Sequence, residues 1–290
     1  MSVHVRAPAS TANLGAGFDC AAAALELWNE LIVEPNGAGT RIEIDGEGAD
    51  ELSRGEDHLA LRAFAHFASP AGYHFRFINR IPLERGLGSS ASAIALGLIA
   101  GAAATGALPT TAELLAAGEP FEGHSDNLAA ALYGGVCISW RHDGLVSARQ
   151  LAADLPLAPV LVVPLARTST FRSRSSLPFT VTHQDAAASA ASATLLGAAI
   201  ADGDAELFAN SLHDRLHEPY RITSAPLLAE LREQLPDGAV GVTLSGSGPS
   251  VVVWALEADV ERVVDELRRS LSPETTVLPL RVAQTGASLE

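Results

Sequence analysis

The sequence predicts an α+β protein of two domains. At 290 residues and 48% hydrophobic content, the chain can bury one large or two medium cores. Its first half is predicted as strands with interleaved helices. Its second half is predicted as strand, helices, strand, strand, helix and strand, the order of an α+β sandwich. We place the boundary in the proline-bearing segment 156–159, which divides the chain into domains 1–157 and 158–290.

The first half opens with strands. Residues Val3–Ala7 are predicted as the first strand, and Pro8 is expected to end it because proline lacks a backbone donor and fixes φ. A loop dense in turn-forming residues follows over 8–19. Two further strands are predicted over 29–35 and 40–45, since a Pro-Asn-Gly turn signal separates them.

The other elements are predicted from apolar periodicity, at every second position for strands and every three to four for helices, from continuous apolar runs, and from helix-start signals such as the N-cap at Thr110 or Thr111. Helices are predicted from about residue 56, over 91–106 and 111–118, up to Tyr133, over 184–200 and 204–212, up to Leu235, and around the apolar face 260–267. Strands are predicted over 73–77, 136–140 and 160–163, on both sides of 243–250, and over 276–282.

Composition excludes several classes of protein. A net charge of −15 argues against binding to nucleic acid or to an anionic membrane surface, where clustered basic charge supplies much of the affinity. Cys20 and Cys137 fit no metal-ligand spacing, and no stretch qualifies as an export signal or a membrane span. We therefore expect a soluble cytoplasmic protein.

The chain contains no lysine, so all 19 of its Lys+Arg residues are arginines. A Walker A loop and a protein kinase each need a lysine on the nucleotide phosphates, and Schiff-base chemistry needs one on the substrate. Nucleotide chemistry in this chain must rest on backbone donors, serines, a metal ion and arginines.

The glycine-serine segment 82–92 opens onto a small, apolar helix. A helix start carries unpaired N–H groups and a partial positive charge, and Gly86 and Gly88 let the backbone close around an anion. Hydroxyls at Ser89, Ser90 and Ser92 can cap the helix, contact phosphate or bind Mg²⁺. The pattern predicts a phosphate site, although a plain capped core helix stays open. A dinucleotide fingerprint is disfavoured because no strand directly precedes it and no suitable acid follows.

Four more polar segments are candidates for ligand contact. The cluster Glu122–Asn127 could complete a magnesium site with a loop serine and face a substrate hydroxyl, or it could be a capped helix with solvated acids. Three arginines in 167–178 suit carboxylate or phosphate capture, or form a solvated loop. Loop 8–19 suits small-molecule contact or is an ordinary connection. The loop 243–250 is interpreted as a ligand wall, too elaborate for a hairpin.

Segments 8–19, 82–92 and 244–250 resemble the three motifs of the GHMP kinases, in order and over almost the whole chain. Within that superfamily, 7–19 resembles the homoserine kinases, as do three further segments, 122–127, 169–174 and 218–221. The resemblance implies an N-terminal domain like ribosomal protein S5 domain 2, with a left-handed βαβ crossover, and a ferredoxin-like C-terminal α/β sandwich.

The resemblance also implies an activity, namely ATP- and Mg²⁺-dependent phosphorylation of the side-chain hydroxyl of L-homoserine to O-phosphohomoserine, in threonine biosynthesis. Two alternatives stay open, a GHMP kinase for another small alcohol and a non-catalytic nucleotide-binding sensor. A homodimer is one option for the assembly. The chain departs from the family pattern at Asp57-His58-Leu59, where members often have Asn-Leu at the adenine contact.

Residue roles are carried over from the family motifs. Ser90 and Glu122 would hold Mg²⁺, with Glu122 a better candidate than Glu119. Substrate binding would involve Asn13, Asp19, Asn127, Arg174 and Arg221. The catalytic set would be Asn127, Asp126, Ser90 and Glu122, with the role of Asp126 as a base left open. The ATP-binding set would be Pro82, Leu83, Glu84, Arg85, Gly86, Leu87, Gly88, Ser89, Ser90, Ala91, Ser92, Gly246 and Ser247.

Overall fold

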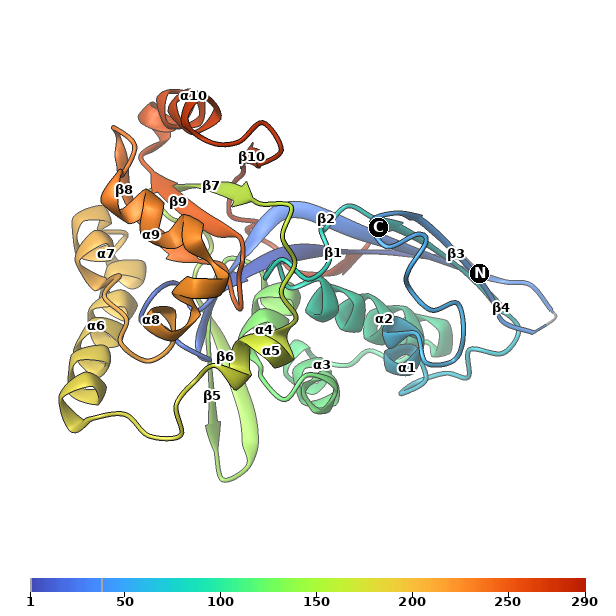
Figure 1. Cartoon of the computed structure of the whole chain (residues 1–290). Helices are drawn as coiled ribbons and strands as arrows, with labels where there is room; N and C mark the ends of the chain where they lie inside the picture. Colours follow the sequence, from blue (N-terminus) through green and yellow to red (C-terminus); the bar gives the residue numbers. More distant parts are fainter. Residues whose placement is uncertain (1, 38) are drawn as a thin grey trace.

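The computed structural model describes residues 2–37 and 39–290, except for the side chains of 170–172. In the described residues the strands form two sheets, each covered by helices (Figure 1). The larger sheet has the order β11-β1-β2-β4-β3, with β5 paired to β2 and β6 paired to β5. The smaller sheet has the order β10-β7-β9-β8. The predicted α+β class is confirmed.

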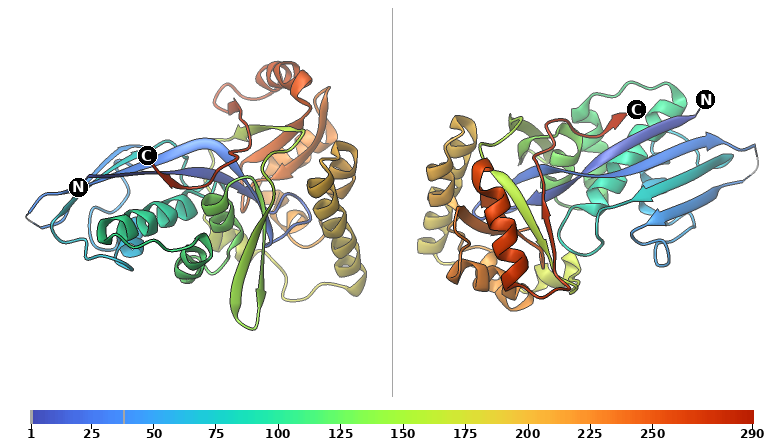
Figure 2. Two further views of the ribbon diagram at one scale, coloured as in Figure 1. Left: turned by 180° about the vertical axis from the view of Figure 1, so that it is seen from behind. Right: turned by 90° about the horizontal axis from the view of Figure 1, so that it is seen from above.

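The larger sheet takes its strands mainly from the first half of the chain. They are β1 (Val3–Ala12), β2 (Ala21–Pro35), β3 (Arg41–Gly46), β4 (Tyr73–Asn79), β5 (Val136–His142), β6 (Leu145–Ala152) and β11 (Ser288–Leu289). β3 and β4 are parallel, and the other neighbours are antiparallel. Because β11 pairs with β1, the C-terminus returns to the N-terminal sheet, and the two ends of the chain lie near each other (Figure 2).

The helices of the first half cover one face of the larger sheet (Figures 1 and 2). They are α1 (Leu59–Phe64), α2 (Ser89–Thr105), α3 (Thr111–Gly118), the 3₁₀ turn η1 (Glu119–Phe121) and α4 (Asp126–Tyr133). Ile94 and Leu98 of α2 are buried against Phe64 of α1 and Phe75 of β4. The apolar character of α2 around its circumference therefore matches a helix enclosed by its neighbours.

The smaller sheet is antiparallel and belongs to the second half. Its strands are β7 (Ala158–Val163), β8 (Ala239–Leu244), β9 (Val251–Ala255) and β10 (Thr276–Pro279). The helical elements of this half are α5 (Thr170–Ser175), α6 (His183–Asp202), α7 (Ala205–Ser211), α8 (Glu218–Arg221), η2 (Ile222–Ser224), α9 (Pro226–Glu233), η3 (Glu257–Asp259) and α10 (Val260–Ser270). Across the sheet, the strands that come fourth, first, third and second along this half of the chain lie side by side. This order is the ferredoxin-like arrangement that was predicted.

Alternating residues of β9 bury two different cores, as the period of a strand requires. Val253 packs with α9 and α10. Val252 and Trp254 pack with α6 and α7, in a core that also includes Leu14 and Leu87 from the first half of the chain. This shared core fixes the two halves of the chain against each other, and a pocket lies where they meet.

Several predicted boundaries were wrong. Pro8 does not end β1, since pairing with β2 continues across a register shift between Pro8 and Ala9, where a bulge accommodates the missing N–H. The helix expected from residue 56 begins at Leu59. Strand β10 ends at Pro279 rather than at 282, and β6 was not predicted.

The loop 243–250 joins β8 and β9, which are antiparallel neighbours. It is therefore a hairpin connection, contrary to the expectation that it is too elaborate for one. Within the described residues, no helix is both long and apolar enough to cross a membrane.

Candidate active site

A pocket of about 600 Å³ lies between the two halves of the chain. Most of the residues carried over from the family motifs line it. They are Asn13, Asp19, all of Pro82 to Ser90, Glu122, Asp126, Asn127, Arg174, Arg221, Gly246 and Ser247. Ala91 and Ser92 are exceptions, because both are fully buried and the Ser92 hydroxyl donates to the carbonyl of Ala7 at 3.3 Å. Their side chains therefore do not line the pocket, and their place in the ATP-binding set stays a prediction.

Helix α2 starts at the pocket without a side-chain cap. Its N-cap is Gly88, at φ 65°, and Gly86 lies at φ 74°. A Cβ on Gly86 would lie 2.0 Å from the carbonyl oxygen of Ser245, and a Cβ on Gly88 would lie 2.0 Å from the Ser10 hydroxyl. Only glycine fits both the backbone conformation and the space. The first N–H groups of α2 thus face a pocket suited to an anion.

The second half of the chain holds this loop in place. The Ser245 hydroxyl donates to the carbonyl of Gly86 at 2.7 Å. The guanidinium of Arg85 donates to the carbonyls of Pro164 and Leu165, each at 2.8 Å. These bonds fix the loop at Arg85 and Gly86, so it would lose little further freedom on binding an anion, which favours affinity.

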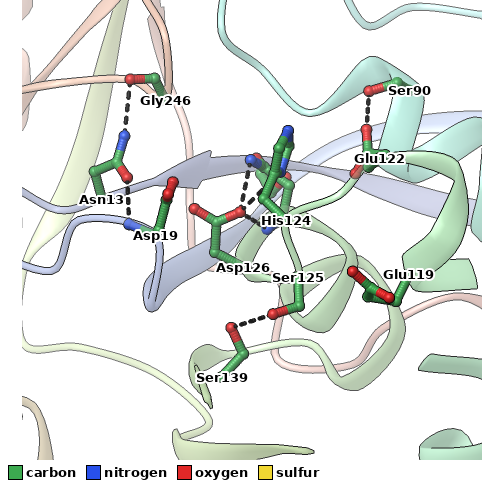
Figure 3. Close-up of polar contacts among 12 residues, drawn as sticks. Asn13, Asp19, Ser90, Glu119, Glu122, His124, Ser125, Asp126, Ser139 and Gly246 are labelled. Atoms are coloured by element: carbon green, nitrogen blue, oxygen red, sulfur yellow. Dashed lines mark hydrogen bonds and ion pairs between the residues drawn. The ribbon is translucent and has the colours of Figure 1, made fainter. Parts of the chain in front are cut away.

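Ser90 and Glu122 face each other beside the loop (Figure 3). The Ser90 hydroxyl donates to Oε1 of Glu122, while Oε2 of Glu122 is buried without a partner. Burial raises the pKa of the Glu122 carboxyl. Glu119 forms an ion pair with Arg141 instead. A carboxylate with an unsatisfied oxygen next to a hydroxyl and the open start of α2 fits Mg²⁺, which prefers oxygen ligands and shares them with substrate phosphates.

Among the residues that the structure describes, no three His, Cys, Asp or Glu side chains converge on a point that could hold a metal ion. A cation at Ser90 and Glu122 would therefore need phosphate oxygens or water to complete its shell. That is the usual situation for Mg²⁺ in phosphoryl-transfer sites.

The start of α4 forms a hydrogen-bonded group beside the metal candidate. The buried Asp126 carboxylate accepts through Oδ1 from the backbone N–H of Asn127 at 2.8 Å and faces Nδ1 of His124 at 3.3 Å. Burial would lower the pKa of His124, but the neighbouring Asp126 outweighs it and raises that pKa. The amide oxygen of Asn127 accepts from the Ser10 hydroxyl at 2.8 Å. Asp126 and Asn127 are thus held in fixed orientations at the pocket wall.

Asn13 joins the two loops at the end of the pocket that is lined by Asp19, Arg174 and Arg221. Its Nδ2 donates to the carbonyl of Gly246 at 2.9 Å, and its Oδ1 accepts from the N–H of Asp19 at 3.0 Å (Figure 3). The left-handed φ values of Asn13 and Asp19, 74° and 56°, turn the chain sharply here. The amide of Asn13 is largely engaged within the protein, so its main effect is to orient Asp19.

Two arginines meet at this end. Arg174 forms a two-pronged ion pair with Asp19. Arg221 is 2% exposed, and its Nε is buried without a partner. Burial and the neighbouring Arg174 lower the pKa of Arg221 to about 10. Both guanidinium groups lie near the ring of Phe18, with their central carbons 5.9 Å and 5.4 Å from its centre. Two cations held this close favour an anionic ligand.

Sequence reasoning did not single out two residues that contact this arginine pair. Phe18 lies beneath both guanidinium groups, and His217 stacks on Phe18 with ring centres 4.9 Å apart. No local signal was available, because His217 precedes α8 and its contact with Phe18 joins segments about 200 residues apart.

His58 also lies in the pocket wall, together with residues 82–90. Its ring packs on Phe77 with centres 4.5 Å apart, and its Nδ1 is buried without a partner. Burial lowers the pKa of His58, which favours the neutral ring. Leu59 and Leu96 line the same end, which gives it the apolar character suited to a nucleotide base.

The sequence matches two family models of known proteins. The N-terminal domain of the GHMP kinases matches residues 58–135, and the C-terminal domain matches residues 196–272. The fold also resembles mevalonate diphosphate decarboxylase from Staphylococcus aureus, with a TM-score of 0.70 at 17% identity, covering 100% of this chain and 98% of that one. The chain belongs to the GHMP kinases.

Closer relatives narrow the class. Homoserine kinase of Streptomyces coelicolor is 38% identical, over 97% of this chain and 96% of the relative. Homoserine kinase of Mycobacterium tuberculosis is 37% identical, over 95% and 90%. The crystal structure of homoserine kinase from Cytophaga hutchinsonii superposes with a TM-score of 0.87 at 24% identity, covering 100% of this chain and 97% of that one. Within the GHMP kinases, the chain belongs to the homoserine kinase family, which confirms the predicted resemblance.

Proposed function

We propose that this chain transfers the γ-phosphoryl group of ATP to the side-chain hydroxyl of L-homoserine, releasing ADP and O-phospho-L-homoserine for threonine biosynthesis. One observation carries the proposal. A single pocket combines the open start of α2, the Ser90–Glu122 pair and a two-arginine site next to Asp19. These are the parts needed to bind a triphosphate and an amino acid side by side.

The end of the pocket that is lined by Asp19, Arg174 and Arg221, here called the amino-acid end, suits a zwitterion. The substrate ammonium group would bind Asp19, and its carboxylate would bind Arg174 and Arg221. Asp19 and Arg174 pair with each other in the structure, so a zwitterion would offer each of them an opposite charge in exchange. The unpaired Nε of Arg221 adds a donor for the carboxylate.

The phosphates would lie on residues 82–90, against the N–H groups of α2, with Gly246 and Ser247 closing the far side. Ser90 and Glu122 would hold Mg²⁺, which when bound neutralises charge on the phosphates. The chain itself contributes fixed donors and excludes water, both of which favour the transfer.

The chemistry then depends on positioning. The homoserine hydroxyl oxygen forms a bond to the γ-phosphorus while the bond from that phosphorus to the β–γ bridging oxygen breaks, leaving ADP. Asn127 and Asp126 would orient the hydroxyl. Asp126 would accept its proton through the carboxylate oxygen that does not bond to Asn127. A loose phosphoryl transition state needs little help from a base, so we assign most of the acceleration to orientation and charge.

We also propose a cytoplasmic location, supported by the two free cysteines, which suit a reducing compartment. The domain division at residues 157 and 158 stays a proposal, supported by the start of β7 at Ala158. A homodimer stays one option for the assembly.

Purified protein with ATP and Mg²⁺, offered homoserine, threonine, mevalonate and galactose in turn, tests the activity through ADP release. We expect homoserine to be the preferred acceptor by at least about 100-fold, given two charged contacts at the amino-acid end. Preferred transfer to another alcohol would assign the chain to a different GHMP activity. Tight ATP binding without turnover on any acceptor would instead indicate a nucleotide sensor.

A further inference from the structure

His217 and Arg221 form a buried pair behind the amino-acid end of the pocket. His217 is 0% exposed and Arg221 is 2% exposed. Nη1 of Arg221 lies 3.1 Å from Nδ1 of His217 and donates to the carbonyl of Gly246 at 3.3 Å. Nδ1 of His217 and the carbonyl of Gly246 therefore use the two N–H donors of Nη1.

The arrangement fixes the protonation of the imidazole. A guanidinium group can only donate, so Nδ1 of His217 must accept, and the ring proton lies on Nε2. Nε2 then donates to the carbonyl of Gly15 at 2.8 Å. Burial lowers the pKa of His217, in keeping with a neutral ring.

His217 therefore links Arg221 to the loop that carries Phe18 and Asp19. It bonds to Gly15, three residues before Phe18, and its ring stacks on Phe18 at an interplanar angle of 19°. Asp214 holds the other side, because its Oδ2 accepts from the backbone N–H groups of His217 and Glu218, each at 2.8 Å. The imidazole has one well-defined place in the fold.

We propose that His217 is a positioning residue for carboxylate recognition. With Gly246, it occupies Nη1 of Arg221, so the substrate carboxylate is bound by the remaining donors of that guanidinium, including the buried and unpartnered Nε. This proposal rests on the proposed homoserine kinase activity. It assigns to His217 no contact with substrate and no role in the transfer itself.

The test compares two variants of similar shape, His217→Leu and His217→Asn, on two acceptors. The asparagine keeps an acceptor near the position of Nδ1, and the leucine does not. The acceptors are homoserine and 3-aminopropan-1-ol, which is homoserine without its carboxylate. The exposed His213 lies on the same segment, and His213→Leu is the matched control.

We expect His217→Leu to raise the KM for homoserine by at least about tenfold, the scale for loss of a charged hydrogen bond. The KM for ATP and the kcat/KM for 3-aminopropan-1-ol should stay within about twofold of wild type, since neither involves the carboxylate contact. His217→Asn should recover most of the homoserine affinity, and His213→Leu should behave as wild type.

An equal loss of kcat/KM on both acceptors would overturn the proposal, as would an asparagine variant no better than leucine. If the leucine variant does not fold, His217→Ala with added imidazole replaces it. Restored homoserine affinity then supports the proposal, and no restoration in a folded variant overturns it. A wild-type protein that phosphorylates 3-aminopropan-1-ol but not homoserine would instead refute the proposed function, which is a distinguishable result.

Discussion

Arg174 and Asp19 meet in a two-pronged ion pair across the two halves of the chain, with Nη1 to Oδ2 at 3.0 Å and Nη2 to Oδ1 at 2.5 Å. Both side chains are 37% exposed, and exposed pairs of this kind contribute little to stability. The pair is therefore better suited to exchange with a ligand than to holding the fold. A zwitterionic amino acid matches it charge for charge.

Arg174→Ala should weaken homoserine binding. The substrate carboxylate would lose a charged hydrogen bond of about 1.5–3 kcal/mol, or roughly 10- to 150-fold in affinity. We expect this increase in the KM for homoserine, with the KM for ATP nearly unchanged, in steady-state kinetics. Arg149, exposed on β6, provides the matched control Arg149→Ala. Equal effects of the two substitutions on the KM for homoserine would show that Arg174 does not bind the substrate.

Glu122→Gln should change the metal requirement. Replacing a carboxylate oxygen by an amide weakens the only carboxylate assigned to Mg²⁺, so the concentration for half-maximal rate should rise by at least about tenfold. The measurement is a titration of activity against Mg²⁺ at fixed ATP. Glu119→Gln is the control, because Glu119 pairs with Arg141. A shift with Glu119→Gln and none with Glu122→Gln would exchange the two assignments.

Gly86→Ala should distort the phosphate loop. The residue lies at φ 74°, and a Cβ would approach the Ser245 carbonyl to 2.0 Å. We expect a loss of about 1–3 kcal/mol in the free energy of unfolding and a higher KM for ATP. Gly197 lies inside α6, and a Cβ built on it would have no atom within 4 Å. Gly197→Ala should therefore raise the free energy of unfolding by about 0.5–1 kcal/mol. Urea unfolding measures both, and a neutral Gly86→Ala would contradict the loop geometry.

His58 should make folding sensitive to acid. Its folded pKa is lowered by burial, so below the unfolded pKa of about 6.5 the unfolded chain binds more protons than the folded chain. Its contribution to stability is thus present above that pH and is lost as the pH falls towards the folded pKa. Urea unfolding between pH 5 and 7.5 should give a shallower decline for His58→Asn than for wild type. Parallel declines would show that His58 is not buried as described.

Sequence periodicity identified most of the fold. Apolar spacing found α10 and alternation found β4, because each buries a regular face. Helices α2 and α3 were found from their start signals, a glycine-serine turn before an apolar run and a threonine N-cap. Periodicity failed for β6, whose residues are mostly half-buried and so carry no clear alternation. It also failed at Pro8, since a bulge against β2 is a tertiary feature that no local pattern reveals.

The residues of the site also divide into those that the sequence could reveal and those that it could not. The glycines and serines around Gly86 could be found because a phosphate loop needs them in one stretch. Phe18 and His217 could not, since their contacts join segments about 200 residues apart. The Asp19–Arg174 pair was also unforeseen, because each residue was assigned to the substrate and not to the other.

The most direct measurement is the kcat/KM for phosphorylation of homoserine beside 3-aminopropan-1-ol, which lacks the carboxylate, and 4-hydroxybutanoate, which lacks the amino group. If Asp19, Arg174 and Arg221 bind a zwitterion, each analogue should be poorer than homoserine by at least about tenfold, the scale of one charged hydrogen bond. Equal rates on all three would contradict the account, since the charged end of the pocket would then not recognise the amino acid.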